Sequence, residues 1–250
     1  MRKARTYPRR GLHGELVHNI GLKILRGELE PGAFLPNEDH LSTELDVSRN
    51  VVREAIKVLA AKGLVESRPK TGTRVQSRHD WNLLDPDVLA WRIEAGPDDI
   101  FLEEMFAVRR LIEPEAARLA AERATAGDVA ELGRALGEME DAVDDLDAYV
   151  AADVRFHSEI YRASHNELLE YIGEMLRGAN RLSFTLTTRL PGASVAALPL
   201  HAAVHEAIAA RAGEAAVTAM LALLDRSAAL YAETKSSSDM ERNVKRAGSG

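Results

Sequence analysis

Hydrophobic residues in the first third of the chain recur at helical spacing, and short polar breaks separate the runs. The pattern predicts helices over residues 12–25, 37–45 and 49–62, with a three-residue turn at 46–48 between the last two. Two short strands are expected at 64–67 and 73–76, around a turn that contains Pro69 and Gly72. This order is typical of a winged helix-turn-helix, which we place at residues 7–77.

The remainder of the chain keeps the helical period and lacks strand-like alternation. Helical runs are expected over 87–94, 98–125, 128–144, 146–163, 167–187, 195–210 and 214–233. Alanine is frequent in these runs, in agreement with its high helix propensity. We therefore predict a mostly α protein, with a linker at 78–85, an all-α helical bundle at 86–234, and a disordered polar tail at 235–250.

Length and composition exclude several kinds of functional site and of protein. The chain has 250 residues, which suits two modest domains, and its lack of cysteine excludes disulfides, thiolate metal sites and cysteine nucleophiles. We find neither a signal peptide nor a run of about 18 uncharged apolar residues, so we expect a cytoplasmic protein with no membrane partner.

The net charge of −7 hides an asymmetry between the two parts. Residues 1–78 carry 15 Lys and Arg against 9 Asp and Glu, a balance of +6, and the remaining residues carry 17 against 30, a balance of −13. A cationic first domain suggests that this domain faces a polyanion while the acidic part has another task.

The predicted helix 49–62 has one apolar face and one cationic face. Its apolar stripe consists of Val52, Ala55, Ile56 and Leu59. The opposite face presents Arg49, Asn50, Arg53 and Lys57, and Ser48 is placed to cap the helix. A recognition helix directs such residues at base edges in the major groove of double-stranded DNA. The hairpin tip would assist at the sugar-phosphate backbone through Lys70, Thr71, Gly72 and Thr73. A solvated face is the simpler alternative, but it leaves the turn, cap, hairpin and local charge as coincidences.

Two pairs of polar residues at i, i+4 spacing fall in the predicted bundle. Asp153 and His157 share one helix face, and His201 and His205 share another. Two such pairs facing each other would hold a divalent cation such as zinc through imidazole and carboxylate. The alternative is that each histidine lies at the surface or is hydrogen-bonded in the core.

The first of these regions resembles GntR-type bacterial regulators. The resemblance rests on the segments 27–32 (GELEPG), 35–38 (LPNE), 47–56 (VSRNVVREAI) and 63–65 (GLV), together with Leu59 and Gly72. It implies that Arg49 and Arg53 are the principal operator contacts and that the wing around Gly72 assists. Many members carry arginine where this chain has Asp39. An acid that faces a phosphate would be repelled, so we assign Asp39 no DNA contact.

The second region is similar to the FadR-like branch with an FCD effector domain, and to repressors of galactonate-type sugar-acid catabolism. The motifs are 81–91, 108–114 (VRRLIEP), 116–121 (AARLAA) and Asp153 with Phe156-His157, followed by Asn166 and His201. Metal-binding members use one Asp and three His. Asp153, His157 and His201 match three of these ligands, and Leu223 stands at the fourth position. His205 as a substitute, a completing water, or loss of the metal all remain open.

The same resemblance implies that an effector binds near Arg109, Asp153, His157, Asn166 and His201. A guanidinium binds a carboxylate through two hydrogen bonds, so Arg109 suits a small carboxylate effector such as a sugar acid, although a structural salt bridge is equally compatible. We therefore expect a ligand-responsive repressor that binds a palindromic operator as a homodimer and is not an enzyme. The alternatives are a metal-dependent hydrolase built on Asp153, His157 and His201, and a constitutive DNA-binding dimer.

Overall fold

The computed structural model describes residues 11–68, 71–96, 99–188 and 190–247, with side chains as far as Lys235. The chain divides into two compact units, Met1–Asp98 and Asp99–Gly250, each with its own hydrophobic core. The mostly α fold class is confirmed, since strands are described only in the small hairpin of the first unit.

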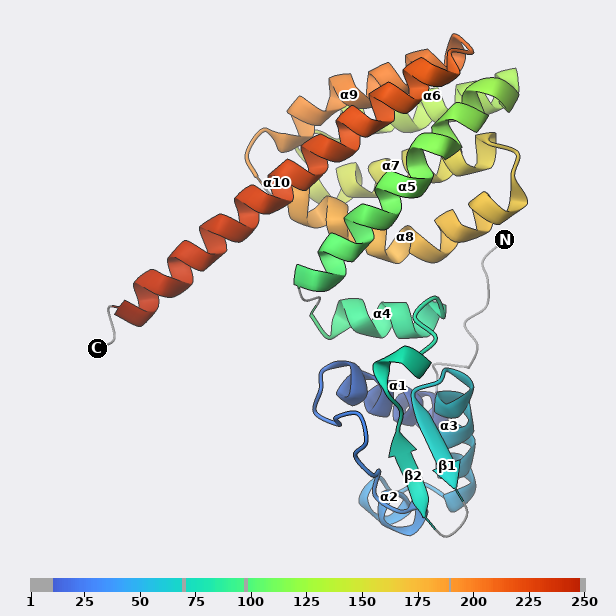
Figure 1. Cartoon of the computed structure of the whole chain (residues 1–250), viewed down its shortest axis with the longest axis vertical. Helices are drawn as coiled ribbons and strands as arrows, with labels where there is room; N and C mark the ends of the chain where they lie inside the picture. The colour runs from blue at the N-terminus through green and yellow to red at the C-terminus, as the bar shows by residue number, and fades with distance from the viewer. Residues whose placement is uncertain (1–10, 69–70, 97–98, 189, 248–250) are drawn as a thin grey trace. The chain divides into compact units, whose positions relative to one another are not determined.

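The first unit is a winged helix-turn-helix (Figure 1). Its elements are α1 (Leu12–Leu25), α2 (Glu38–Glu44), α3 (Arg49–Ala61), β1 (Val65–Arg68), β2 (Gly72–Val75), the short 3-10 helix η1 (Arg78–Asp80) and α4 (Pro86–Glu94). The two strands are antiparallel, with Val65 opposite Val75 and Arg68 opposite Gly72. These elements confirm the predicted order of helices and hairpin.

Local chemistry sets both ends of α3. The hydroxyl oxygen of Ser48 accepts a hydrogen bond from the backbone N–H of Val51 at 3.3 Å, as a helix N-cap does. Gly63 follows the helix with φ 73°, the left-handed conformation in which glycine has no steric penalty. A Cβ at Gly63 would lie 2.0 Å from the carbonyl oxygen of Asp80, so this position requires glycine. Between these ends the predicted stripe is buried.

Helix α4 belongs to the first unit. The Trp91 side chain is fully buried, and its indole Nε1 donates a hydrogen bond to Nδ1 of His18 on α1 at 2.9 Å. Lys62, at the end of α3, is also buried, and its Nζ lies 2.8 Å from both Asp85 and Asp87. Residues 86–94 were expected in the helical bundle instead. The helical period cannot distinguish these assignments, because the partners of α4 are distant in sequence.

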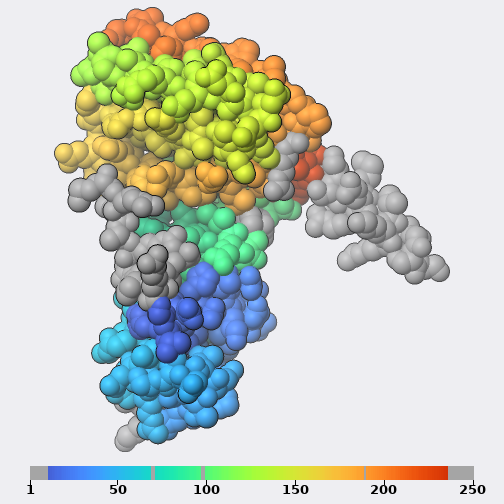
Figure 2. Space-filling view, turned by 180° about the vertical axis from the view of Figure 1, so that it is seen from behind, coloured from blue at the N-terminus to red at the C-terminus, as the bar shows by residue number. Residues whose placement is uncertain are grey.

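The second unit is a bundle of long helices, as predicted (Figure 1). It contains α5 (Asp99–Arg123), α6 (Ala126–Asp141), α7 (Leu146–Ala163), α8 (Glu167–Thr188), α9 (Ala193–Ala209) and α10 (Gly213–Ala247). Helix α7 packs between α6 and α8 and also contacts α5, which makes it a central element of the bundle. Figure 2 shows the outer surface of α6, in lime, as an unbroken layer of side chains.

Helix α10 extends beyond its predicted end. The sequence indicated a helix to residue 233 and a disordered tail from 235, whereas the helix continues to Ala247, and residues 248–250 lie outside the described part. The Nζ of Lys235 lies 3.1 Å from Asp99 and 3.3 Å from Glu103 on α5. Lys235, the first residue of the expected tail, therefore has partners on α5 that composition did not reveal.

One segment of α10, Gly213–Lys235, is long and apolar enough to cross a membrane by length and composition, with a mean hydropathy of 1.3. A core helix of a soluble protein passes the same test. Here Met220, Leu223 and Leu224 lie in the hydrophobic core of the bundle, and α10 packs against α5 and α9. The most apolar window of this segment is 33% buried, so these contacts account for part of its apolar composition.

Candidate functional site

The polar face of α3 is exposed along its length. Arg49, Asn50, Arg53 and Lys57 all lie opposite the buried stripe. The structure therefore leaves the predicted base-reading side chains accessible at the surface. Their contact with DNA stays a prediction.

Two of these arginines are paired with carboxylates of α2. The Nε of Arg49 lies 2.8 Å from Oδ1 of Asp39. Arg53 donates to Glu38 twice, from Nη2 at 2.8 Å and from Nε at 3.4 Å. Asp39, which was expected to make no DNA contact, thus pairs with Arg49, and its position in the sequence could not show this because the pairing depends on how α2 packs against α3.

The hairpin tip holds the other predicted DNA-binding residues. Thr71 lies in the β1–β2 turn, and Gly72, with φ 98°, and Thr73 are the first residues of β2. The hydroxyl of Thr73 is hydrogen-bonded to that of Ser67 across the hairpin. Lys70 lies outside the described residues.

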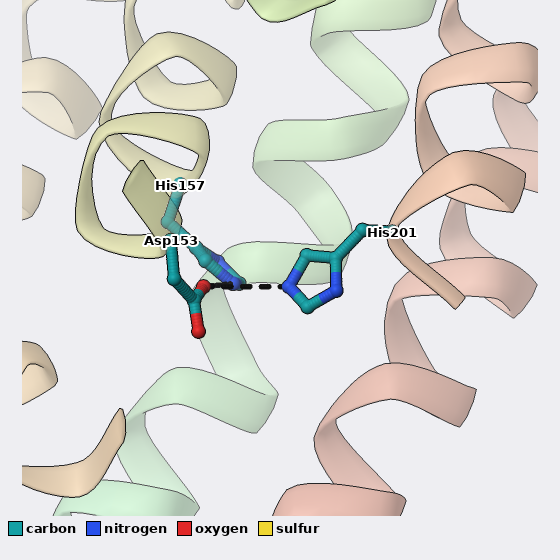
Figure 3. A group of neighbouring side chains, drawn as sticks. All are labelled: Asp153, His157 and His201. Carbon is teal, nitrogen blue, oxygen red and sulfur yellow. Dashed lines mark hydrogen bonds and ion pairs between the residues drawn. The ribbon is translucent and has the colours of Figure 1, made fainter. Parts of the chain in front are cut away.

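The second unit brings three of the predicted polar residues together (Figure 3). The Nε2 atoms of His157 on α7 and His201 on α9 both lie 3.3 Å from the same oxygen, Oδ1 of Asp153. All three side chains are buried, and their candidate ligand atoms lie within 4.8 Å of one another. The i, i+4 spacing predicted the pair on α7, and the packing of α9 supplies His201.

A second carboxylate, that of Glu113, contacts His157 of this cluster. Oε2 of Glu113 on α5 lies 2.8 Å from Nδ1 of His157. Glu113 in turn accepts a hydrogen bond from Nε of Arg109 at 2.7 Å, and the guanidinium carbon of Arg109 lies 4.7 Å from the centre of the Phe184 ring. Glu113 was not among the residues expected from the sequence, although its i, i+4 spacing from Arg109 is the spacing of an ion pair on one helix face.

These contacts shift the pKa values of the buried groups. Burial by itself would raise the pKa of Glu113, but the charges of Arg109 and His157 outweigh it and lower this pKa to about 2. Burial likewise favours neutral His157, yet Glu113 and Asp153 raise its pKa to about 9. The pKa of Asp153 is lowered, because His201 and His157 outweigh the cost of burying its charge.

Asp153, His157 and His201 offer the kinds of ligand atom that bind a divalent cation. Nδ1 of His201 lies 2.9 Å from the carbonyl oxygen of Ala197, and Nδ1 of His157 faces Glu113. A metal that binds Nε2 of His157 would have to displace the proton that the raised pKa keeps on this ring, whereas a neutral ring of His201 that donates from Nδ1 would present an Nε2 lone pair beside Asp153. Two imidazoles and one carboxylate form a common ligand set for zinc and similar metals.

A small cavity of about 20 Å³ adjoins the cluster. Its wall includes Tyr149, Thr187, Leu223, Arg226 and Ser227, together with the three clustered residues. Leu223 stands where the resemblance placed a histidine in other members, so this side of the cluster is apolar. The guanidinium of Arg226 places a positive charge on the cavity wall. Arg226 was not among the residues expected from the sequence, because it lies in none of the motifs quoted above.

The remaining predicted residues have other environments. Among the described residues that line the cavity, Arg109 is absent. Its side chain is fully buried and is hydrogen-bonded to Glu113. The amide oxygen of Asn166 accepts hydrogen bonds from the backbone N–H groups of Leu168 and Leu169, at the start of α8. Nε2 of His205 lies 3.3 Å from the carbonyl oxygen of Val129 on α6. The structure therefore favours the salt-bridge alternative for Arg109 and places Asn166 and His205 apart from the cluster of Asp153, His157 and His201.

Comparison with protein families matches both units. The model described as bacterial regulatory proteins, gntR family, matches residues 12–75, and the model described as FCD domain matches residues 104–226. The matched segments contain α1 to α3 with the hairpin, and most of the helical bundle, respectively.

Curated relatives match over most of their length. The chain is 37% identical over 210 residues to the galactonate operon transcriptional repressor of Escherichia coli (strain K12), covering 84% of this chain and 92% of the relative. It is 33% identical over 206 residues to the HTH-type transcriptional regulator LutR of Bacillus subtilis (strain 168), covering 80% and 92%. Among solved structures, Lar of Listeria monocytogenes has the same fold, with a TM-score of 0.54, 19% identity, and 91% and 99% of the two chains covered.

Proposed function

The chain belongs to the GntR family of bacterial regulatory proteins and carries an FCD domain, and on that premise we propose that it represses a sugar-acid operon in response to a small carboxylate effector. The family and the relatives make it a DNA-binding transcription regulator rather than an enzyme. The hydrolase alternative is therefore not favoured.

The observation that carries the proposal is the exposed face of α3. Arg49 and Arg53 extend from the first and second turns of a capped helix whose opposite side is buried. Arginine can donate two hydrogen bonds to guanine in the major groove, and the N-terminal part of a recognition helix lies nearest to the bases. A homodimer would place two such helices on the half-sites of a palindromic operator, about one helical turn apart.

The effector would bind at the cavity of the FCD domain. Arg226 would bind its carboxylate, and Thr187, Ser227 and Tyr149 would offer hydrogen bonds to hydroxyl groups. Asp153, His157 and His201 would hold a divalent metal. When bound, that metal would supply a positive centre for oxygen atoms of the effector. The name of the galactonate-operon relative supports a sugar acid as the chemical class.

The size of the cavity links effector binding to a structural change. Ligand pockets commonly measure about 300–1,000 Å³, whereas this cavity measures about 20 Å³. A sugar acid therefore requires the cavity wall to open, and α8, α9 and α10 all contribute to that wall. An effector that prefers the open arrangement would shift the population of conformations and with it the affinity for the operator.

The test follows binding of a fluorescent operator duplex by anisotropy. We expect Arg49→Ala/Arg53→Ala to abolish specific binding while leaving the melting temperature unchanged, since both side chains are exposed. Galactonate, gluconate and lactate would be titrated with and without zinc, and at least one should weaken operator binding and raise the melting temperature. Unchanged operator affinity in the double variant would overturn the DNA assignment, and no response to any organic acid would overturn the effector assignment.

A further inference from the structure

The carboxylates of α2 lie within the predicted DNA-reading face. Asp39 contacts the guanidinium of Arg49 at 2.8 Å, and Glu38 contacts that of Arg53 at 2.8 and 3.4 Å. The side-chain oxygen of Asn37 accepts a hydrogen bond from the backbone N–H of His40 and caps α2, which fixes the first turn from which both acids extend.

The two ion pairs, Asp39 with Arg49 and Glu38 with Arg53, are arranged in a similar way. Arg49 and Arg53 lie one turn apart on α3, and consecutive residues of α2 supply the two carboxylates. Glu38 binds both Nε and Nη2 of Arg53, so the plane of that guanidinium is held relative to the helix. Nη1 of Arg53 takes no part in the two hydrogen bonds to Glu38. This arrangement orients two cations before any DNA is present.

A carboxylate beside each arginine also changes what kind of DNA contact is favourable. A phosphate that approaches the pair meets a negative charge within a few ångströms of the positive one, so the net attraction is small. A guanine edge is neutral, and it can bind the remaining N–H groups while the acid stays paired. Because Asp39, Arg49 and Arg53 are exposed and Glu38 is partly exposed, the pairs contribute little to folding stability.

We propose that Asp39, together with Glu38, positions Arg49 and Arg53 for base contacts and lowers the affinity of this face for DNA that lacks the operator sequence. The inference rests on the proposed role of α3 in operator binding. It gives a function to Asp39, the residue at which this chain departs from the pattern of many family members.

The experiment measures two affinities for each variant over a range of salt concentrations. The probes are an operator duplex recovered by selection from a random library and a scrambled duplex of equal length and base composition. We expect Asp39→Asn to bind the scrambled duplex about tenfold more tightly, to bind the operator no more tightly, and to steepen the salt dependence on scrambled DNA by about one unit of logarithmic slope. Glu38→Gln should act in the same direction through Arg53.

Glu44→Gln is the matched control. Glu44 lies on the same helix, is exposed, and pairs with His40 rather than with an arginine of α3. The control makes the same change of charge, so it should alter binding to both duplexes equally. Asp39→Glu keeps the charge, so this variant should prefer the operator over the scrambled duplex as the unaltered protein does.

Two outcomes separate the inference from its premise. If Arg49→Ala abolishes operator binding while Asp39→Asn behaves like Glu44→Gln, the inference about Asp39 is wrong and the proposed function stands. If Arg49→Ala leaves operator binding unchanged, the proposed role of α3 is wrong as well. A loss of affinity for both duplexes in Asp39→Asn would also overturn the selectivity role.

Discussion

The imidazole of His157 is held at both ends, with Glu113 Oε2 lying 2.8 Å from its Nδ1 and Asp153 Oδ1 lying 3.3 Å from its Nε2. Glu113 therefore fixes the ring orientation that presents Nε2 to the candidate metal site. Carboxylates in this position orient a ligand and raise its basicity, and their loss commonly weakens metal binding.

Replacing Glu113 should affect both stability and metal binding. Glu113→Gln leaves the buried guanidinium of Arg109 without its carboxylate, and breaking such a pair costs about 3–5 kcal/mol in free energy of unfolding. We expect zinc affinity to fall about 10- to 100-fold as well. Urea denaturation and calorimetric zinc titration measure the two effects.

The double variant Arg109→Met/Glu113→Gln separates these effects. It removes the uncompensated charge, so we expect it to recover part of the lost stability while zinc affinity stays low. If zinc affinity recovered together with stability, Glu113 would have no role in orienting His157.

Leu223 is the position at which a fourth ligand can be added. Its side chain lines the cavity beside Asp153, His157 and His201. We expect Leu223→His to bind zinc about tenfold more tightly, because a fourth protein ligand closes the tetrahedral shell. Zinc titration by calorimetry tests this.

The control for that experiment is His205→Ala, which alters a histidine next to α6 rather than the cavity. It should leave zinc affinity unchanged. A large loss of zinc affinity in this variant would show that His205 is a ligand after all.

Arg226 should control the response to effector rather than DNA binding. A hydrogen bond to a charged group contributes about 1.5–3 kcal/mol, so Arg226→Gln should weaken effector binding about 10- to 100-fold. Operator affinity without effector should not change. Anisotropy with increasing sugar acid measures both quantities.

Arg177→Gln is the matched control, since Arg177 is exposed on α8 and pairs with Glu174. It should respond to effector as the unaltered protein does. Equal responses from the Arg226 and Arg177 variants would remove Arg226 from the effector site.

Asp128 should make stability depend on acidity. It forms a capping box with Thr125 at the start of α6 and lies 2.9 Å from Nε2 of His165. Burial raises the pKa of Asp128, but hydrogen bonds from Thr125 and His165 outweigh it, so the pKa is lowered in the folded protein. The stabilisation is therefore present above the unfolded pKa, about 3.9, and is lost as pH falls through the folded pKa.

We expect Asp128→Asn to cost about 1 kcal/mol in free energy of unfolding near neutral pH. The difference from the unaltered protein should shrink below about pH 4. Urea denaturation at several pH values checks this. Thr125→Ala should lower stability at neutral pH too, and a difference for Asp128→Asn that stays constant down to pH 2 would contradict the assignment.

The sequence predicted most of the elements because their signals are local. The buried stripe of α3, the cap at Ser48 and the left-handed Gly63 each depend on residues within a few positions. The pair Asp153 and His157 was likewise found from helical spacing on α7 alone. His201 was found in the same way from its spacing to His205, but spacing could not show that His201 meets Asp153 and that His205 does not.

Tertiary packing decided which residues meet. The pairing of Asp39 with Arg49, the support of His157 by Glu113, and the place of Arg226 on the cavity wall all join different helices. The assignment of α4 to the first unit was decided in the same way, by contacts with α1 and α3. Amphipathic spacing states which face of a helix is buried but not which partner covers it. The sequence by itself therefore determined most of the helices, the two ends of α3 and its exposed cationic face, whereas packing between distant segments decided the partners of each buried charge.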